Sequence, residues 1–147
     1  MYLLDTNHCS AIMLGDENAI NRVIEIGEDN ICSCVIVQGE LTFMMEKSQR
    51  KEANLLQLAE FLEDIRIYNI TEETATIYGQ IKAALFERFA PKDKNKRRKT
   101  KITDFGFDEN DLWIAAIALQ NNLIIASIDS DFLRIQQVKD LQLESWI

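Results

Sequence analysis

The stretch Tyr2-Leu3-Leu4-Asp5 places an acidic residue directly after a short apolar run. Such a run predicts a buried strand, and the charged residue marks its end. A carboxylate in this position faces a desolvation cost on the order of several kcal/mol unless a metal ion or hydrogen bonds compensate it. We therefore expect a central strand over residues 2–4 and a functional role for Asp5.

The rest of the chain alternates between short apolar runs and segments with helical periodicity. The predicted strands cover residues 31–37, 65–70, 123–127 and 141–146, and the predicted helices cover residues 17–26, 38–46, 51–64, 71–90, 112–120 and a short segment near Phe132. This alternation predicts an α/β fold with a mostly parallel central sheet and helices on both faces. The 147 residues suit a single domain.

The composition excludes several classes of protein. No apolar run is long enough to cross a bilayer, so we expect no membrane association and a cytoplasmic location. Cys9, Cys32 and Cys34 are odd in number and form no C-x-x-C pair, which favours buried, reduced thiols over disulfides or a zinc site. His8 is the only histidine, so it is more plausibly structural than part of a catalytic triad. No phosphate-binding loop motif occurs.

The net charge of −8 is unfavourable for binding to phosphates. However, residues 92–101 hold seven basic residues against one acid, a local charge of +6. The seven are Lys92, Lys94, Lys96, Arg97, Arg98, Lys99 and Lys101. This segment, within a basic insertion at about residues 91–107, is either a contact surface for the phosphates of a nucleic acid or a solvated insertion that keeps the protein soluble. We favour the first interpretation because the segment directly precedes Asp111.

Four acidic residues lie where the predicted strands end or the following helices begin: Asp5, Glu40, Asp111 and Asp129. The carboxyl ends of parallel strands meet at one rim of a sheet, so these side chains should converge there. Helix capping alone could explain Glu40 and Asp111. A cluster of carboxylates repels itself, and a hard cation such as Mg²⁺ or Mn²⁺ is the usual remedy. Such a cation supports hydrolysis without a nucleophilic side chain.

Four segments carry a resemblance to a known family: Leu3-Leu4-Asp5-Thr6-Asn7, Gln38-Gly39-Glu40-Leu41, Asn110-Asp111-Leu112-Trp113-Ile114-Ala115 and Ser127-Ile128-Asp129-Ser130-Asp131-Phe132. In this order they resemble the motifs of PIN domains over nearly the whole chain. The length, the segment Tyr78-Gly79-Gln80-Ile81 and Trp146 further resemble the VapC toxins of bacterial toxin-antitoxin pairs. A phosphatase of the haloacid dehalogenase type is disfavoured because its D-x-D motif would need an acid at Asn7.

The resemblance implies a metal-dependent endoribonuclease that uses Mg²⁺ or Mn²⁺. It also implies a small cognate antitoxin encoded beside the protein, and commonly a homodimer. The alternatives are a PIN nuclease of RNA maturation without an antitoxin, and a catalytically silent binding module. The implied metal ligands and catalytic residues are Asp5, Glu40, Asp111 and Asp129, supported by Thr6, Asn7, Ser127 and Asp131.

Two points remain open in the sequence. Asp129 and Asp131 compete for the fourth acidic position, and we favour Asp129 because it is nearer the strand end, with Asp131 as the cap of a short helix. Phe43, Met44 and Met45 offer more apolar surface than one sheet face needs, which suggests a homodimer contact. The alternative is that these three side chains fill the core.

Overall fold

The computed structural model describes residues 1–147 and contains one five-stranded sheet. Its strands are β1 (Tyr2–Leu4), β2 (Ile31–Cys34), β3 (Arg66–Tyr68), β4 (Ile124–Ala126) and β5 (Gln142–Glu144). The strand order is β3-β2-β1-β4-β5, and every pairing is parallel. The predicted α/β class with a parallel sheet is therefore confirmed, and β1 is the central strand.

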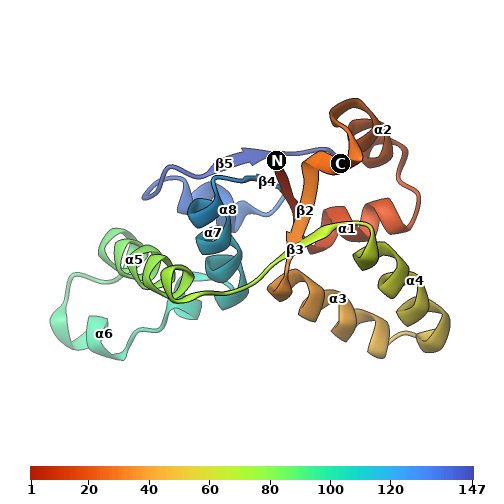
Figure 1. Ribbon diagram of the computed structural model, residues 1–147. Helices are drawn as coiled ribbons and strands as arrows, with labels where there is room; N and C mark the ends of the chain where they lie inside the picture. The colour runs from red at the N-terminus through yellow and green to blue at the C-terminus, as the bar shows by residue number, and fades with distance from the viewer.

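Eight α-helices and two short 3₁₀ helices, η1 (Glu28–Asn30) and η2 (Ile102–Phe105), connect the strands. The α-helices are α1 (Thr6–Met13), α2 (Glu17–Ile26), α3 (Val35–Glu46), α4 (Lys51–Glu63), α5 (Glu72–Phe89), α6 (Lys94–Lys99), α7 (Glu109–Asn121) and α8 (Ser130–Ile135). Figure 1 shows α1, α3 and α4 on one side of the strands and α5, α7 and α8 on the other. The layered arrangement agrees with the prediction.

The core lies between the central strand and α7. Leu3 and Leu4 of β1 are fully buried, and α7 buries five consecutive residues, 114–118. A helix that is apolar on all sides belongs between two other layers, and α7 indeed packs against α5 on the side away from the sheet (Figure 1). This packing fixes the N-terminus of α7, which carries Asp111, close to the end of β1.

The predicted strand over residues 31–37 is too long. The strand ends at Cys34, and α3 begins at Val35. A continuous apolar run cannot by itself separate a buried strand from a buried first helical turn, and Val37 is fully buried as part of that turn. The helix α1 was not predicted. Its N-cap is Asp5, whose side chain accepts a hydrogen bond from the backbone N–H of His8.

The basic segment forms a short helix rather than an extended loop. Asp93 caps α6 by accepting hydrogen bonds from the backbone N–H groups of Asn95 and Lys96. Arg97 Nη2 donates a hydrogen bond of 3.0 Å to the carbonyl oxygen of Phe86, which ties α6 to the last turns of α5. Figure 1 places α6 at the edge of the molecule, on the same side as α5.

The three apolar residues considered for a homodimer contact have different environments. Phe43 is 60% exposed and Met44 is 41% exposed, so the possibility that these two side chains fill the core is wrong. Met45 is partly buried and packs against the core. No helix of the protein is long and apolar enough to span a membrane.

Candidate active site

A cavity of about 710 Å³ opens at the carboxyl ends of β1 and β4. Only three of its 14 lining residues are hydrophobic. Seven of the others are acidic: Asp5, Glu40, Asp108, Glu109, Asp111, Asp129 and Asp131. The four acids singled out in the sequence therefore converge on one rim, as the parallel sheet topology requires.

Asp5 lies at the base of this cavity and is 4% exposed. Its Oδ1 accepts hydrogen bonds from the backbone N–H of His8 at 2.8 Å and faces the ring Nδ1 of His8 at 2.9 Å. Its Oδ2 accepts a hydrogen bond from Ser127 Oγ at 2.5 Å. These contacts compensate the burial of the carboxylate and fix its orientation.

Glu40 projects from α3 and is held by two neighbouring elements. Thr6 Oγ1 of α1 donates a hydrogen bond to Glu40 Oε2. Asn110 Nδ2 of α7 donates a hydrogen bond of 2.9 Å to Glu40 Oε1. The carboxylate is thus fixed between α1 and α7, on the wall of the same cavity.

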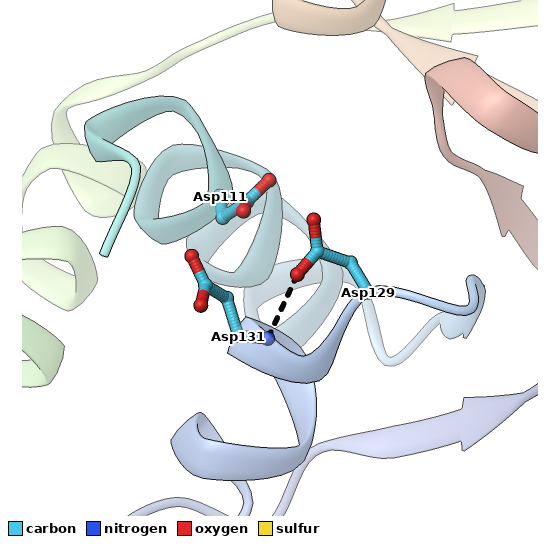
Figure 2. A group of neighbouring side chains, drawn as sticks. All are labelled: Asp111, Asp129 and Asp131. Atoms are coloured by element: carbon cyan, nitrogen blue, oxygen red, sulfur yellow. Dashed lines mark hydrogen bonds between the residues drawn. The ribbon is translucent and has the colours of Figure 1, made fainter. Parts of the chain in front are cut away.

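Asp111, Asp129 and Asp131 form the most compact part of the site. One carboxylate oxygen of each lies within 4.8 Å of the others, and Figure 2 shows the three side chains pointing toward one another from α7, the loop after β4 and α8. The dashed bond in Figure 2 joins the backbone N–H of Asp131 to Asp129 Oδ1 at 2.8 Å.

This geometry corrects the role expected for Asp131. The cap of α8 is Asp129, while Asp131 lies in the first turn and turns its carboxylate toward the cavity. Asp131 Oδ2 also accepts a hydrogen bond of 3.1 Å from the backbone N–H of Asp108. Both candidates for the fourth acidic position are therefore part of one cluster with Asp111.

The pKa of Asp111 is raised to about 8, first by burial and then by the negative charges of Asp129, Asp131 and Asp108. A carboxyl group in these surroundings holds a proton more tightly than it would in water. A bound cation would reverse this effect because it favours the ionised form. The repulsion between Asp111 and its acidic neighbours is thus of the kind that a divalent cation relieves.

The donor set of the cavity fits a hard cation such as Mg²⁺ or Mn²⁺. The acidic residues around it offer only oxygen ligands, which is the preference of both ions. The cysteines play no part, because burial raises the pKa of the Cys9 thiol and all three thiols are buried. This agrees with the expectation of inert, reduced thiols.

The other predicted site residues either lie at the cavity or lie away from it. Thr6 and Asn7 line the cavity, and Ser127 lies behind it in contact with Asp5. None of the seven basic residues of segment 92–101 lines the cavity. That segment leads instead into η2 and residues 106–108, which do form part of the wall.

Sequence reasoning missed Asp108 and Glu109, which line the cavity, and also His8 and Asn110, which contact Asp5 and Glu40. A signal for His8 exists in the spacing Asp5-x-x-His8, because a residue at the third helical position can contact the N-cap residue. No comparable signal identifies Asn110, whose partner lies 70 positions away.

The parallel sheet and the carboxylate cluster at its central strand define the class. The chain belongs to the PIN domain family, whose model matches residues 2–138. Among curated proteins it is similar to Ribonuclease VapC2 of Rickettsia felis, with 27% identity over 99% of this chain and 98% of the relative. It is also similar to the tRNA(fMet)-specific endonuclease VapC of Shigella flexneri, with 26% identity over 99% of this chain and 97% of the relative.

Solved structures show the same fold. The VapBC2 structure of Rickettsia felis, bound to a promoter DNA fragment, matches with a TM-score of 0.78 and 24% identity, covering 99% of this chain and 98% of that chain. The DNA-bound VapBC structure of Salmonella typhimurium matches with a TM-score of 0.76 and 23% identity, covering 99% and 98%. These likenesses extend over the full length of the domain.

Proposed function

We propose that the protein is a metal-dependent endoribonuclease of the VapC type, the toxin of a toxin-antitoxin pair. The observation that carries this proposal is the cavity on a PIN fold that gathers Asp5, Glu40, Asp111, Asp129 and Asp131 around one opening. Full-length relatives named as VapC ribonucleases support it. A silent binding module is disfavoured because such modules typically lose these acids.

In this proposal Asp5, Glu40, Asp111 and Asp129 hold Mg²⁺ or Mn²⁺, with Asp131 beside them. When bound, such a cation lowers the pKa of water and stabilises charge on a phosphoryl oxygen. The chain contributes the geometry. Ser127 orients one ligand, and Thr6 and Asn110 orient Glu40 between them. Asn7 lines the same opening, where it can contact RNA.

RNA must approach a strongly acidic opening, so the proposal needs a source of positive potential. Helix α6 supplies it at the edge of the molecule (Figure 1), with Lys94, Lys96, Arg98 and Lys99 exposed there. We propose that RNA phosphates contact this helix and its flanking residues Lys92 and Lys101. The phosphodiester chain would then pass along η2 toward the carboxylates.

Two protein partners complete the proposal. A small antitoxin is supported by the VapBC complexes of similar fold. A homodimer contact is supported by Phe43 and Met44 on α3, which are exposed although they are large and apolar. A PIN nuclease of RNA maturation without an antitoxin remains the second candidate, and a small reading frame beside the gene would argue against it.

The direct test is cleavage of RNA by the Asp5→Asn variant, with Mn²⁺ present. The amide preserves the shape of the side chain and removes the charge, so we expect activity to fall at least about 100-fold. Excess EDTA should abolish the activity of the unchanged protein.

Total tRNA is a suitable first substrate because one relative is named for tRNA(fMet) cleavage. The matched control is Asp16→Asn at the N-cap of α2, outside the cavity. Cleavage that persists in EDTA would refute the proposal.

A further inference from the structure

His8 is the one histidine of the chain, and it lies fully buried between the candidate site and the segment after the last strand. Its ring Nδ1 faces Asp5 Oδ1 at 2.9 Å. On the other side of the ring, Nε2 lies 3.1 Å from the backbone nitrogen of Trp146. The imidazole therefore bridges Asp5 at the end of β1 and Trp146, which lies 138 positions after His8 in the chain.

These two contacts determine where the ring carries its proton. The backbone N–H of Trp146 can only donate, so His8 Nε2 must accept and cannot carry hydrogen. The proton then lies on Nδ1, which donates to Asp5. The contact between His8 and Asp5 is therefore a hydrogen bond from a neutral ring, which adds no positive charge beside the cavity.

A neutral donor suits a carboxylate that has to hold a metal ion. An arginine or lysine in the same place would orient Asp5 equally well but would oppose the cation electrostatically. The ring itself cannot turn away, because it is enclosed in the core and packs edge-on against the Trp146 ring, with 5.8 Å between centroids. The Trp146 indole is in turn fixed by a hydrogen bond of 3.1 Å to Glu144 Oε1 in β5.

We propose that His8 is a positioning residue for metal binding, which holds Asp5 in its ligating orientation and is itself set by the Trp146 backbone. This inference rests on the proposed function, because it assumes that Asp5 binds a cation. His8 touches neither the cavity nor any substrate position. Its effect is therefore expected on the cation affinity of the folded protein rather than on the RNA-binding surface.

The test is calorimetric titration of Mn²⁺ into the full chain and its variants, without RNA. An asparagine side chain can place its amide nitrogen near the position of Nδ1, whereas the amide of glutamine reaches the position of Nε2. We expect His8→Asn to bind Mn²⁺ within about threefold of the unchanged protein. His8→Gln and His8→Leu should bind at least about tenfold more weakly, the usual cost of losing a residue that orients a metal ligand.

Loss of stability alone must be separated from loss of positioning. Thr74→Val removes another fully buried polar group, at the N-terminus of α5 and outside the cavity, and should lower Tm without changing Mn²⁺ affinity. If His8→Leu does not fold, the comparison of His8→Asn with His8→Gln decides the question. Equal affinities for these two variants, or an effect of Thr74→Val as large as theirs, would overturn the role of His8. If the unchanged protein binds no Mn²⁺, the proposed function itself fails.

Discussion

Ser127 Oγ donates a hydrogen bond of 2.5 Å to Asp5 Oδ2, although the two residues are 122 positions apart in the chain. The contact exists because β4 pairs directly with β1, with Leu4 opposite Ala126. Each of the two residues follows immediately after its strand. The strand register therefore determines both the position of the central carboxylate and the donor that orients it.

We predict that Ser127→Ala weakens Mn²⁺ affinity and RNA cleavage by about 10- to 100-fold, because Asp5 loses the donor to Oδ2. Ser127→Thr should keep both within a few fold, since threonine retains the hydroxyl group. Calorimetry and initial cleavage rates measure the two quantities. Equal effects of alanine and threonine would show that the hydroxyl group does not position Asp5.

The stability of the protein in EDTA should depend on the protonation of Asp111. Its pKa is about 8 in the folded protein against an ordinary 3.8. Between these values the folded state binds a proton that the unfolded chain has released, so this group's contribution to stability falls as pH rises from about 4 to about 8. Above the folded pKa the penalty stays constant. Below the ordinary pKa both states are protonated and the contribution disappears.

Melting temperatures measured in EDTA between about pH 6 and pH 9 test this sign. We expect the Tm of the unchanged protein to fall across this range more steeply than that of Asp111→Asn, which has no proton to lose. Saturating Mn²⁺ should remove much of the difference, because a cation stabilises the ionised carboxylate. Parallel Tm profiles for the two proteins in EDTA would contradict the raised pKa of Asp111.

The exposed apolar side chains of α3 make a separate prediction about assembly. Replacing both Phe43 and Met44 with serine should shift the protein toward monomer in sedimentation at micromolar concentration, because their apolar area is the proposed contact. Ile24→Ser on α2 is the control, since Ile24 is 71% exposed and lies on a different helix. If the unchanged protein sediments only as monomer, the homodimer proposal fails under those conditions.

The sequence predicts an element correctly where a single physical cause determines that element. An apolar run that ends in an acid predicted β1 and singled out Asp5, because such a run is typical of a buried strand. The limits of β2 could not be predicted, because Val35 and Val37 suit a strand and a buried helix equally well. The packing of α3 against the sheet determines where β2 ends and the helix begins.

The prediction that Asp131 caps the short helix α8 was wrong for a related reason. Either residue could cap a helix from its composition alone, since aspartate is favoured at an N-cap. Only the backbone distinguishes them: Asp129 has the extended conformation of a cap, with φ −73° and ψ 128°, and accepts from the N–H of Asp131. The contact of His8 with Trp146 also depends on the tertiary fold, which no local pattern records.

The last prediction concerns α6, where the structure changes the choice of residues to replace. Arg97 anchors the helix to Phe86, so replacing it would disturb the fold as well as the charge. The exposed residues Lys96, Arg98 and Lys99 can be changed to glutamine while Arg97 is kept. We expect weaker RNA binding and a shallower salt dependence, by about 2 in the log-log slope if three phosphate contacts of roughly 0.7 each are lost.

A control of equal charge separates a local contact from a general effect of net charge on RNA binding. Lys47, Arg50 and Lys51 are exposed at the junction of α3 and α4, across the molecule from α6 (Figure 1). Their replacement by glutamine lowers the net charge by the same amount, but should leave the salt slope nearly unchanged because no phosphate contact is proposed there. Mn²⁺ affinity should be retained in both triple variants, since neither set lines the cavity. Equal losses of RNA affinity in the two variants would mean that α6 provides no specific path for RNA.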